Sequence, residues 1–507
     1  MDIVVNEKIT HVTVNATSVQ PVIDTHVANI NTPIPGKSAY QSAVDNGFVG
    51  TEQQWIDSLK PPQGHTHPIA DINNLQTELD SKQPAGSYAG ANHTHDDRYY
   101  TETEIDERLG ELYGSVPVDV IGDGIADDTL ALQAWLDSAD TLIHLSGTYR
   151  ITAGLVSNIP GRVIMGASAT ILVDTPAEQT ALTITAGSTD VFGVSIDGAS
   201  KAARGIRVQA AGCRVVDNVL SNFYSTTGQA TAVEVDTNGG SRVLGNRITN
   251  VHSVGDSTFG NANGSARGIS VHNSVAAVTS TLIADNYISG ITGEEGDAIH
   301  VAFWDGSTTT PFRSAHTVVR NNDIWDATRR YIKIQGSDVI VYGNIMSTTF
   351  TAPPAGASEC ILVSRSDRVK LINNQINYNH LQRPVNISGS VDHLCDDIVI
   401  EGNSIFQLLD KTHVGLSINY VANSTIKNNT VRGGNVGIAV AYSNDVAVTS
   451  NVVYTGGTTG AVISGNGSCN RVVVHGNINM NPYRPVPWQN YSTDGITEGN
   501  ISLPVPA

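Results

Sequence analysis

From residue 200 onward, short apolar stretches alternate with polar turns, and an Asn stands just before many of the apolar stretches. Neighbouring copies lie from about 22 to about 40 residues apart. A minimum near 22 with longer insertions is typical of one coil of a right-handed parallel β-helix whose loops absorb the excess. We expect each Asn to adopt the left-handed backbone of a tight turn and to hydrogen-bond from coil to coil. The repeated residues are Asn218, Asn246, Asn286, Asn322, Asn344, Asn374, Asn403, Asn429, Asn451, Asn477 and Asn500.

A second apolar strand recurs between these Asn residues. Side chains alternate between the two faces of a strand, so one set of branched residues is predicted to point into the solenoid: Ile206, Val233, Ile269, Ile299 and Ile332. The motif copies are GIRV (205–208), AVEV (232–235), GISV (268–271), AIHV (298–301), YIKI (331–334), CILV (360–363), GLSI (415–418) and GIAV (437–440). The pattern predicts an all-β, single-stranded parallel β-helix over residues 116–480, closed by a C-terminal segment at 481–507.

The chain before residue 116 has a different pattern, and it predicts two further regions. Residues 1–35 alternate like strands, and residues 36–60 contain two short helical patterns around the turn Asn46-Gly47. Thr51 is a suitable N-cap for a helix that buries Trp55 and Leu59. We interpret residues 1–60 as one N-terminal region.

Residues 61–115 contain two short heptad-like stretches, in which the apolar residues are Ile72, Leu75, Leu79, Ile105, Leu109 and Leu112. Each stretch is too short to be stable as an isolated helix. They are expected to form a coiled-coil shaft only where several identical chains are held together.

The composition excludes several classes of protein. With 29 Lys and Arg against 48 Asp and Glu, the chain has a formal net charge of −19, which argues against a nucleic-acid partner. No apolar run is long enough to span a membrane, and the N-terminus lacks the basic and then apolar order of a signal peptide. We therefore expect synthesis in a host cytoplasm without membrane insertion. The four separated cysteines argue against a zinc site or a disulfide framework.

Residues 119–150 resemble the entry motif of the pectate-lyase-like β-helix superfamily, as found in many phage tailspikes. The matching residues are GDG at 122–124, DDT at 127–129, Gln133 and GTY at 147–149. Asp127 or Asp128 is expected to cap a helix whose apolar side chains close the open end of the solenoid: Leu132, Trp135 and Leu136.

Two upstream stretches are similar to phage tail fibres and tailspikes. SAYQSAVDNGFVGTEQQWIDSLK resembles a short module of such fibres, and GHTHPIADI and NHTHDDRYYTETEID resemble their trimeric shaft segments. The resemblance implies a homotrimeric appendage of the virion, attached to phage tail or baseplate proteins through residues 1–60. Its solenoid would act outside the cell on a bacterial surface polysaccharide.

The shaft segments contain two His-x-His pairs: His65 with His67, and His93 with His95. Residues i and i+2 of an extended strand face the same way, so three chains would present six imidazoles to a threefold axis. That ligand set suits iron or another octahedral transition metal. The alternative is a set of packed histidines bonded to backbone carbonyls. No cofactor is required by any other motif.

If the branched residues point inward, the next residues form an outward column: Arg207, Glu234, Ser270, His300 and Lys333. A parallel column contains Gln209, Asp236, His272, Ala302 and Gln335. Adjacent coils lie about 4.8 Å apart, so acids and bases would accumulate on this face. The widest spacings of the Asn repeat also bracket it, and long insertions in a solenoid commonly carry function.

Nearby carboxylates and an aromatic residue suggest saccharide chemistry. Glycosidic cleavage needs two carboxyl groups flanking the bond, and their separation decides between retention and inversion, which the sequence leaves open. The candidate catalytic residues are Glu234, Asp236, Glu294, Glu295 and Asp297. The candidate substrate-binding residues are His272, His300, Trp304, Asp305, Arg330 and Lys333.

Two interpretations of this face remain. In the first, the chain is a tailspike that binds and cleaves a capsule, exopolysaccharide or O-antigen, as a glycoside hydrolase rather than a lyase. In the second, the same trimer is a non-enzymatic receptor-binding or structural fibre, and the acids pair with bases as in any polar solenoid face. The stretch 329–333 resembles the basic strand of polygalacturonase-type β-helices, but the other motifs of that group are missing, which argues against pectin hydrolysis.

Overall fold

The computed structural model describes residues 39–59, 117, 119–175, 178–254, 264–303, 313–351, 358–378, 383–407, 414–454, 463–466, 468–481 and 492–504. The chain divides into two units, Met1–Tyr99 and Tyr100–Ala507. The predicted strands of residues 1–35 and the predicted shaft of residues 61–115 lie outside the described residues.

The described part of the first unit contains helices α2 (Ala39–Asp45) and α3 (Glu52–Ser58). Thr51 is the N-cap of α3: its hydroxyl accepts a hydrogen bond from the backbone N–H of Gln54, and the Gln54 side chain accepts one from the backbone N–H of Thr51. The expected burial is wrong for Leu59, whose side chain is 63% exposed, and Trp55 is only partly buried. Two seven-residue helices have too little apolar surface to cover them.

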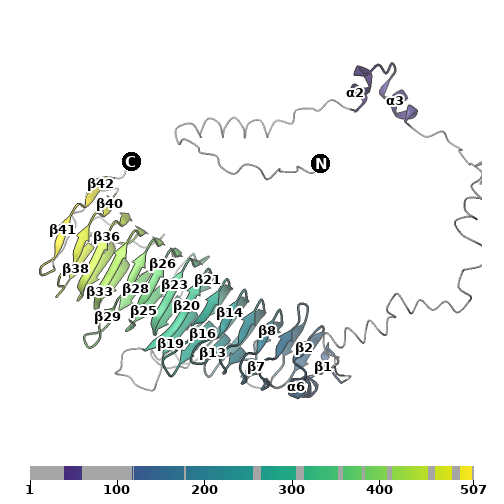
Figure 1. Ribbon diagram of the computed structural model, residues 1–507, viewed down its shortest axis with the longest axis horizontal. Helices are drawn as coiled ribbons and strands as arrows, with labels where there is room; N and C mark the ends of the chain where they lie inside the picture. The colour runs from purple at the N-terminus through teal and green to yellow at the C-terminus, as the bar shows by residue number, and fades with distance from the viewer. Residues whose placement is uncertain are drawn as a thin grey trace, which may run out of the picture. The chain divides into compact units, whose positions relative to one another are not determined.

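The second unit is a right-handed parallel β-helix. Its described residues form three parallel sheets of 15, 12 and 15 strands, which we call sheets A, C and B. Sheet A runs from β1 (Asp123–Asp127) to β42 (Ile501–Pro504), and sheet C from β4 (Leu155–Ser157) to β38 (Ile463–Asn466). Sheet B runs from β2 (Leu142–His144) to β41 (Ile496–Glu498), so strands continue beyond residue 480. Figure 1 shows them stacked one behind another along the solenoid.

Each coil visits sheet A, then sheet C, then sheet B. In the coils that carry the candidate site, the sheet A strands are β12 (Val219–Ser225), β15 (Arg247–Ser253), β18 (Tyr287–Thr292) and β21 (Asp323–Ala327). The sheet C strands are β10 (Arg204–Val208), β13 (Ala230–Asp236), β16 (Ser265–Asn273), β19 (Glu295–Phe303), β22 (Arg330–Gln335) and β25 (Ile361–Ser364). The sheet B strands are β11 (Arg214–Val216), β14 (Arg242–Leu244), β17 (Thr281–Ala284), β20 (Ser314–Arg320) and β23 (Ser337–Tyr342).

The predicted inward column is confirmed, because Ile206, Val233, Ile269, Ile299 and Ile332 pair in register and are fully buried. The same sheet contains β28 (Val385–Ser388), which continues the column between β25 and β32 (Val414–Asn419). The motif series did not include this copy, VNIS, because Pro384 precedes its first inward residue, where the other copies have Gly, Ala, Cys or Tyr.

The predicted Asn ladder is confirmed along its whole length. In each step the side-chain oxygen of one Asn accepts hydrogen bonds from the backbone and side-chain amides of the Asn one coil earlier, as Asn246 does from Asn218 at 3.0 and 2.9 Å. The ladder continues unbroken to Asn500. One expectation was wrong: the residue with left-handed backbone is the one before each ladder Asn, for example Asp217 (φ 54°) and Gly245 (φ 63°). The turn therefore uses Gly, Asp, Asn or Ser at that position, and the Asn supplies hydrogen bonds.

Helix α6 (Thr129–Asp137) lies at the β1 end of the solenoid (Figure 1). Its buried Leu132 and Leu136 face apolar side chains of the first coils, among them Ile143 and Leu155. Helix α6 therefore closes this end of the solenoid as predicted. The two aspartates have separate roles: the Asp127 carboxylate accepts from the Thr129 N–H at 3.1 Å, and the Asp128 carboxylate accepts from the Ile121 N–H at 2.8 Å.

Candidate functional site

The predicted outward column exists on sheet C. Arg207, Glu234, Ser270, His300 and Lys333 are direct register partners on five successive strands. The parallel column is present from Asp236 through His272 to Ala302 and Gln335, whereas Gln209 follows the end of β10. The alternation of side chains along a strand was therefore enough to place these residues on one face.

The column is much less exposed than its outward direction suggests. The exposed fractions of Glu234 and His300 are 7% and 3%, and Asp297, which lies beside the column on β19, is completely buried. Burying a charged group is costly unless it is paired, so the arrangement of the neighbouring charges decides what these residues can do.

At the centre of the face, the acids of β19 contact two bases of β22 and Arg329, which directly precedes it. Glu295 lies 2.9 Å from the Arg329 guanidinium, 2.9 Å from that of Arg330 and 3.1 Å from the Lys333 ammonium. Asp297 lies 3.1 Å from Arg330 and 3.7 Å from Lys333. All charged partners here are at least four-fifths buried, and Arg330 also contacts Glu359 at 3.3 Å.

The acids of β13 pair with the bases of β10. Glu234 lies 2.5 Å from Arg204 and 3.7 Å from Arg207, and Asp236 lies 2.7 Å from Arg207. The side chain of Asp236 is the more exposed of the two acids, at 38%. Every predicted catalytic acid except Glu294 is therefore held in an ion pair. Glu294 is partly exposed, and its backbone carbonyl accepts a hydrogen bond from Arg329.

The charges around Glu295 determine its protonation state. Burial raises the pKa of this carboxyl, but the adjacent Lys333, Arg330 and Arg329 charges outweigh burial and lower the pKa to about 2. A general acid for glycosidic cleavage must carry a proton near neutral pH. Glu295 is ionised there, so it is suited to hold neighbouring cations and poorly suited to protonate a leaving group.

Both predicted histidines of the face are held in the neutral form. Burial lowers the pKa of His300, and the nearby Arg267 and Lys333 charges lower it further. Burial and Arg267 also lower the pKa of His272. The His300 ring is bonded to the Gln335 side chain at 3.0 Å, and the two imidazoles lie 6.4 Å apart.

Six predicted residues lie outside the described residues: Trp304 and Asp305 of the substrate-binding set, and the metal candidates His65, His67, His93 and His95. Iron at the histidine pairs therefore stays a prediction. Within the described ranges, no group of three or more His, Cys, Asp or Glu is arranged to hold a metal ion.

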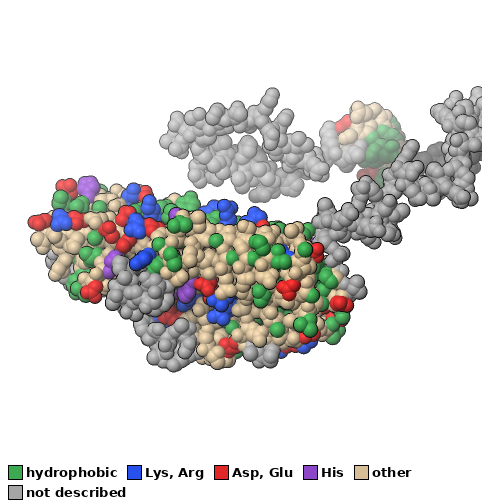
Figure 2. All heavy atoms as spheres, turned by 60° about the horizontal axis from the view of Figure 1, so that its bottom comes forward, with side chains coloured by type: hydrophobic (Ala, Val, Ile, Leu, Met, Phe, Trp, Pro, Cys, Tyr) green, Lys and Arg blue, Asp and Glu red, His purple; other side chains and the backbone are tan. Residues whose placement is uncertain are grey.

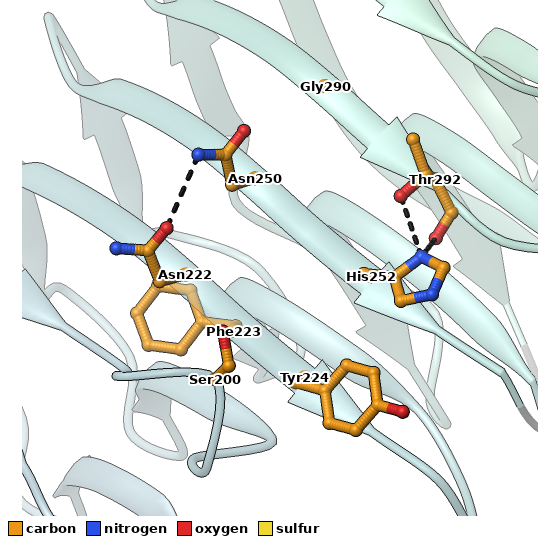
Figure 3. Close-up of a pocket in the computed structure, with 8 residues that line it drawn as sticks. All are labelled: Ser200, Asn222, Phe223, Tyr224, Asn250, His252, Gly290 and Thr292. Atoms are coloured by element: carbon orange, nitrogen blue, oxygen red, sulfur yellow. Dashed lines mark hydrogen bonds between the residues drawn. The ribbon is translucent and has the colours of Figure 1, made fainter.

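A surface pocket that the sequence reasoning missed lies on sheet A (Figure 3). It has a volume of about 370 Å³ and is lined by residues of β12, β15 and β18 and of the turn after β9 (Ser195–Asp197). Its lining residues are Ser200, Asn222, Phe223, Tyr224, Asn250, His252, Gly290 and Thr292. This volume is within the ordinary range of small-ligand sites.

Stacked rings and amide groups form the pocket. The Tyr224 and His252 rings stack with centroids 5.5 Å apart and planes at 24°. Beside them, the Asn250 side-chain amide donates to the Asn222 side-chain oxygen at 3.3 Å, and the Asn222 amide donates to Asp197 at 2.9 Å. The lining contains no Asp, Glu, Lys or Arg side chain.

The Thr292 carbonyl fixes how His252 presents its ring. Nδ1 of His252 lies 3.0 Å from the Thr292 carbonyl oxygen and 2.7 Å from its hydroxyl. The carbonyl can only accept and the hydroxyl can also donate, so Nδ1 is paired with Thr292 in either tautomer, and Nε2 is the ring nitrogen available to a ligand. The pocket therefore offers an imidazole nitrogen, amides and a phenol beside an aromatic surface.

The aromatic surface continues along the outer face of sheet A. Trp325 of β21 is the register partner of Ser289, next to the pocket residue Gly290. Its indole N–H donates to Asp323 at 2.7 Å, and the Arg247 guanidinium lies 4.4 Å from the centroid of the Tyr287 ring. The sequence signal was present, since Tyr224, His252 and Thr292 each follow an inward apolar residue, but the acids and bases that suggested a site lie on the strands of sheet C.

On the face shown in Figure 2, acidic and basic groups lie beside one another, and apolar groups are scattered among uncharged polar surface. No helix of the described segments is long and apolar enough to cross a membrane.

Comparisons with known proteins match the chain by fold. A family model described as "Right handed beta helix region" matches residues 355–495. No curated protein sequence matches the chain significantly. Among solved structures, the surface adhesin PfbA of Streptococcus pneumoniae is 15% identical, with a TM-score of 0.49, and the alignment covers 69% of this chain and 91% of that one.

Two other similar structures are a phage protein and an enzyme. The Dettilon tailspike protein is 15% identical, with a TM-score of 0.43, over 84% of this chain and 73% of that one. An alginate lyase solved with a ligand called G6 is 13% identical, with a TM-score of 0.48, over 73% and 87%. Taken together, the three parallel sheets, the continuous Asn ladder and the matched family model identify the chain as a right-handed parallel β-helix protein.

Proposed function

We propose that the protein is a homotrimeric phage tailspike or tail fibre whose solenoid binds a bacterial surface polysaccharide. The proposal for the virion end depends on the resemblance of residues 38–60 and of the two shaft segments to tail-fibre modules. The residues before 61 would attach to phage tail or baseplate proteins. The solenoid would meet the host surface outside the cell.

The observation that carries the binding function is the stacked Tyr224–His252 pair in the pocket on sheet A. Sugar rings have an apolar face that packs on aromatic rings, and hydroxyls that bond to amides and imidazoles. Asn222, Asn250 and His252 supply both donors and acceptors beside the rings. A small apolar ligand would leave these polar groups unpaired, so a saccharide is the better match.

The geometry favours binding over cleavage by the predicted acids. Glu234, Asp236, Glu295 and Asp297 all lie in ion pairs, and the low pKa of Glu295 keeps it ionised. We therefore propose that the protein is a receptor-binding appendage. Depolymerase activity is the alternative, and the same experiment decides between the two.

The test uses the recombinant full-length protein and purified capsule or lipopolysaccharide from the host bacterium. Tyr224→Ala should weaken binding about tenfold, corresponding to about 1.4 kcal/mol of lost stacking. The matched control is Tyr342→Ala, since Tyr342 is an exposed tyrosine on sheet B, and this variant should bind like the wild type. Equal binding by all three proteins would refute the pocket, and release of new reducing ends would establish a depolymerase.

A further inference from the structure

Arg267 is a buried base that lacks an acidic partner. It lies near the start of β16 and is 8% exposed. Its Nη1 reaches the Ser270 hydroxyl at 3.5 Å, the limit of a hydrogen bond, and its Nε has no hydrogen-bond partner. Among the ion pairs of the described residues, none includes Arg267.

Arg330 shows the opposite behaviour, although Asp297, on the strand between them, is the register partner of both arginines. It is also buried, but it contacts three carboxylates, at 2.9, 3.1 and 3.3 Å. Burial lowers the pKa of both guanidinium groups. For Arg330 the adjacent Asp297, Glu295 and Glu359 charges outweigh burial and raise the pKa, whereas for Arg267 burial prevails and the pKa is lowered.

The acids near Arg267 are committed to other bases. Glu234 pairs with Arg204, Glu295 with Arg329, and Asp297 with Arg330. The cluster contains the bases Arg204, Arg207, Arg267, Arg329, Arg330 and Lys333 and the acids Glu234, Asp236, Glu295, Asp297 and Glu359. With His272 and His300 neutral, one positive charge remains uncompensated.

An uncompensated buried guanidinium is unfavourable for stability, and a Met of similar length would avoid that cost. A guanidinium also presents a planar fork of donors that matches a carboxylate. A binding site can retain such an unfavourable group because the ligand supplies the missing charge.

We propose that Arg267 is an anion subsite on sheet C that takes the carboxylate of an acidic sugar. Ser270 and the neutral His272, on the same strand, would accept or donate to the sugar hydroxyls. The cluster reaches solvent on the β10–β13 side, where the side chains of Arg204, Arg207 and Asp236 are 29%, 33% and 38% exposed.

The subsite and the sheet A pocket flank the same corner of the solenoid. Thr292 of the pocket ends β18, and β19 begins three residues later with Glu295 of the charged cluster. The inference rests on the proposed function, because its ligand is also a saccharide. It adds that this saccharide is acidic.

The test measures the melting temperature of the full-length protein with sodium glucuronate, glucose or sodium acetate, at equal concentration and constant ionic strength. Glucuronate should raise the melting temperature of the wild type more than acetate does, and glucose should not raise it. Arg267→Met should lose the glucuronate shift while melting no lower than the wild type without ligand. Arg330→Met is the matched control and should melt lower, because three buried carboxylates lose a partner.

Three outcomes would overturn the inference: no glucuronate shift in the wild type, a shift that persists in Arg267→Met, or an equal shift with acetate. Arg267→Lys is a second variant that keeps the charge and the fold but lacks the fork, and it should lose most of the shift. Tyr224→Ala should keep the shift, so failure of the sheet A pocket and failure of this subsite can be told apart.

Discussion

Glu295→Gln is the substitution that best separates a structural role from a catalytic one. Glu295 contacts Arg329, Arg330 and Lys333 within 3.1 Å, and its side chain is 15% exposed. A carboxyl with a pKa of about 2 in the folded chain and 4.5 in the unfolded chain stabilises the fold by about 3 kcal/mol at neutral pH. Removing one partner of a buried ion pair costs about 3–5 kcal/mol by itself. The two estimates agree, so we expect Glu295→Gln to lower the free energy of unfolding by about 3 kcal/mol.

The stabilisation by Glu295 should depend on pH in a definite direction. Because the folded-state pKa is the lower one, the stabilisation is fully present above about pH 4.5 and is lost as the pH falls through about 2. The difference between wild type and Glu295→Gln in urea unfolding should therefore be large at pH 7 and shrink toward pH 2.

The neighbouring Glu294→Gln is the control, since Glu294 is partly exposed and makes no ion pair with the described residues. This variant should unfold like the wild type. The reasoning fails if Glu295→Gln and Glu294→Gln unfold within about 1 kcal/mol of each other at pH 7. If Glu295→Gln unfolded like Glu294→Gln but had lost polysaccharide cleavage, Glu295 would be a catalytic acid instead.

Two further predictions concern the ladder and the histidines. Asn374→Ala removes the acceptor of the Asn344 backbone and side-chain amides and the donor to the Val341 carbonyl. At about 1–3 kcal/mol for each orphaned group, the substitution should lower the free energy of unfolding in urea by about 3 kcal/mol or more. Gln375→Ala, at an exposed position, should lower it little. Burial lowers the pKa of His300 and of His272, so the unfolded chain binds protons that the folded chain does not, and stability should fall as the pH drops from 7 to 5. His300→Gln should flatten this dependence in thermal melts, and an unchanged slope would contradict it.

Periodic features of the solenoid could be predicted from the sequence because each copy has the same environment. A ladder residue such as Asn374 contacts the same residue type one coil before and one coil after, so its hydrogen bonds repeat with the coil. The alternation of strand side chains likewise placed Glu234 and His300 in one column. The left-handed position was misassigned because the repeat includes both the Asn and the residue before it, and the pattern alone does not say which of them turns.

The candidate sites depend on contacts that do not repeat. The sequence by itself determined the solenoid, the inward column and the face on which acids and bases meet, because these follow from the spacing of one coil and the alternation of a strand. Only the tertiary structure decided that Glu295 is held by three bases, that Arg267 has no acid and that Tyr224 stacks on His252. These outcomes depend on side-chain directions and distances between coils, since a column of charges can equally form an open site or a closed network of ion pairs.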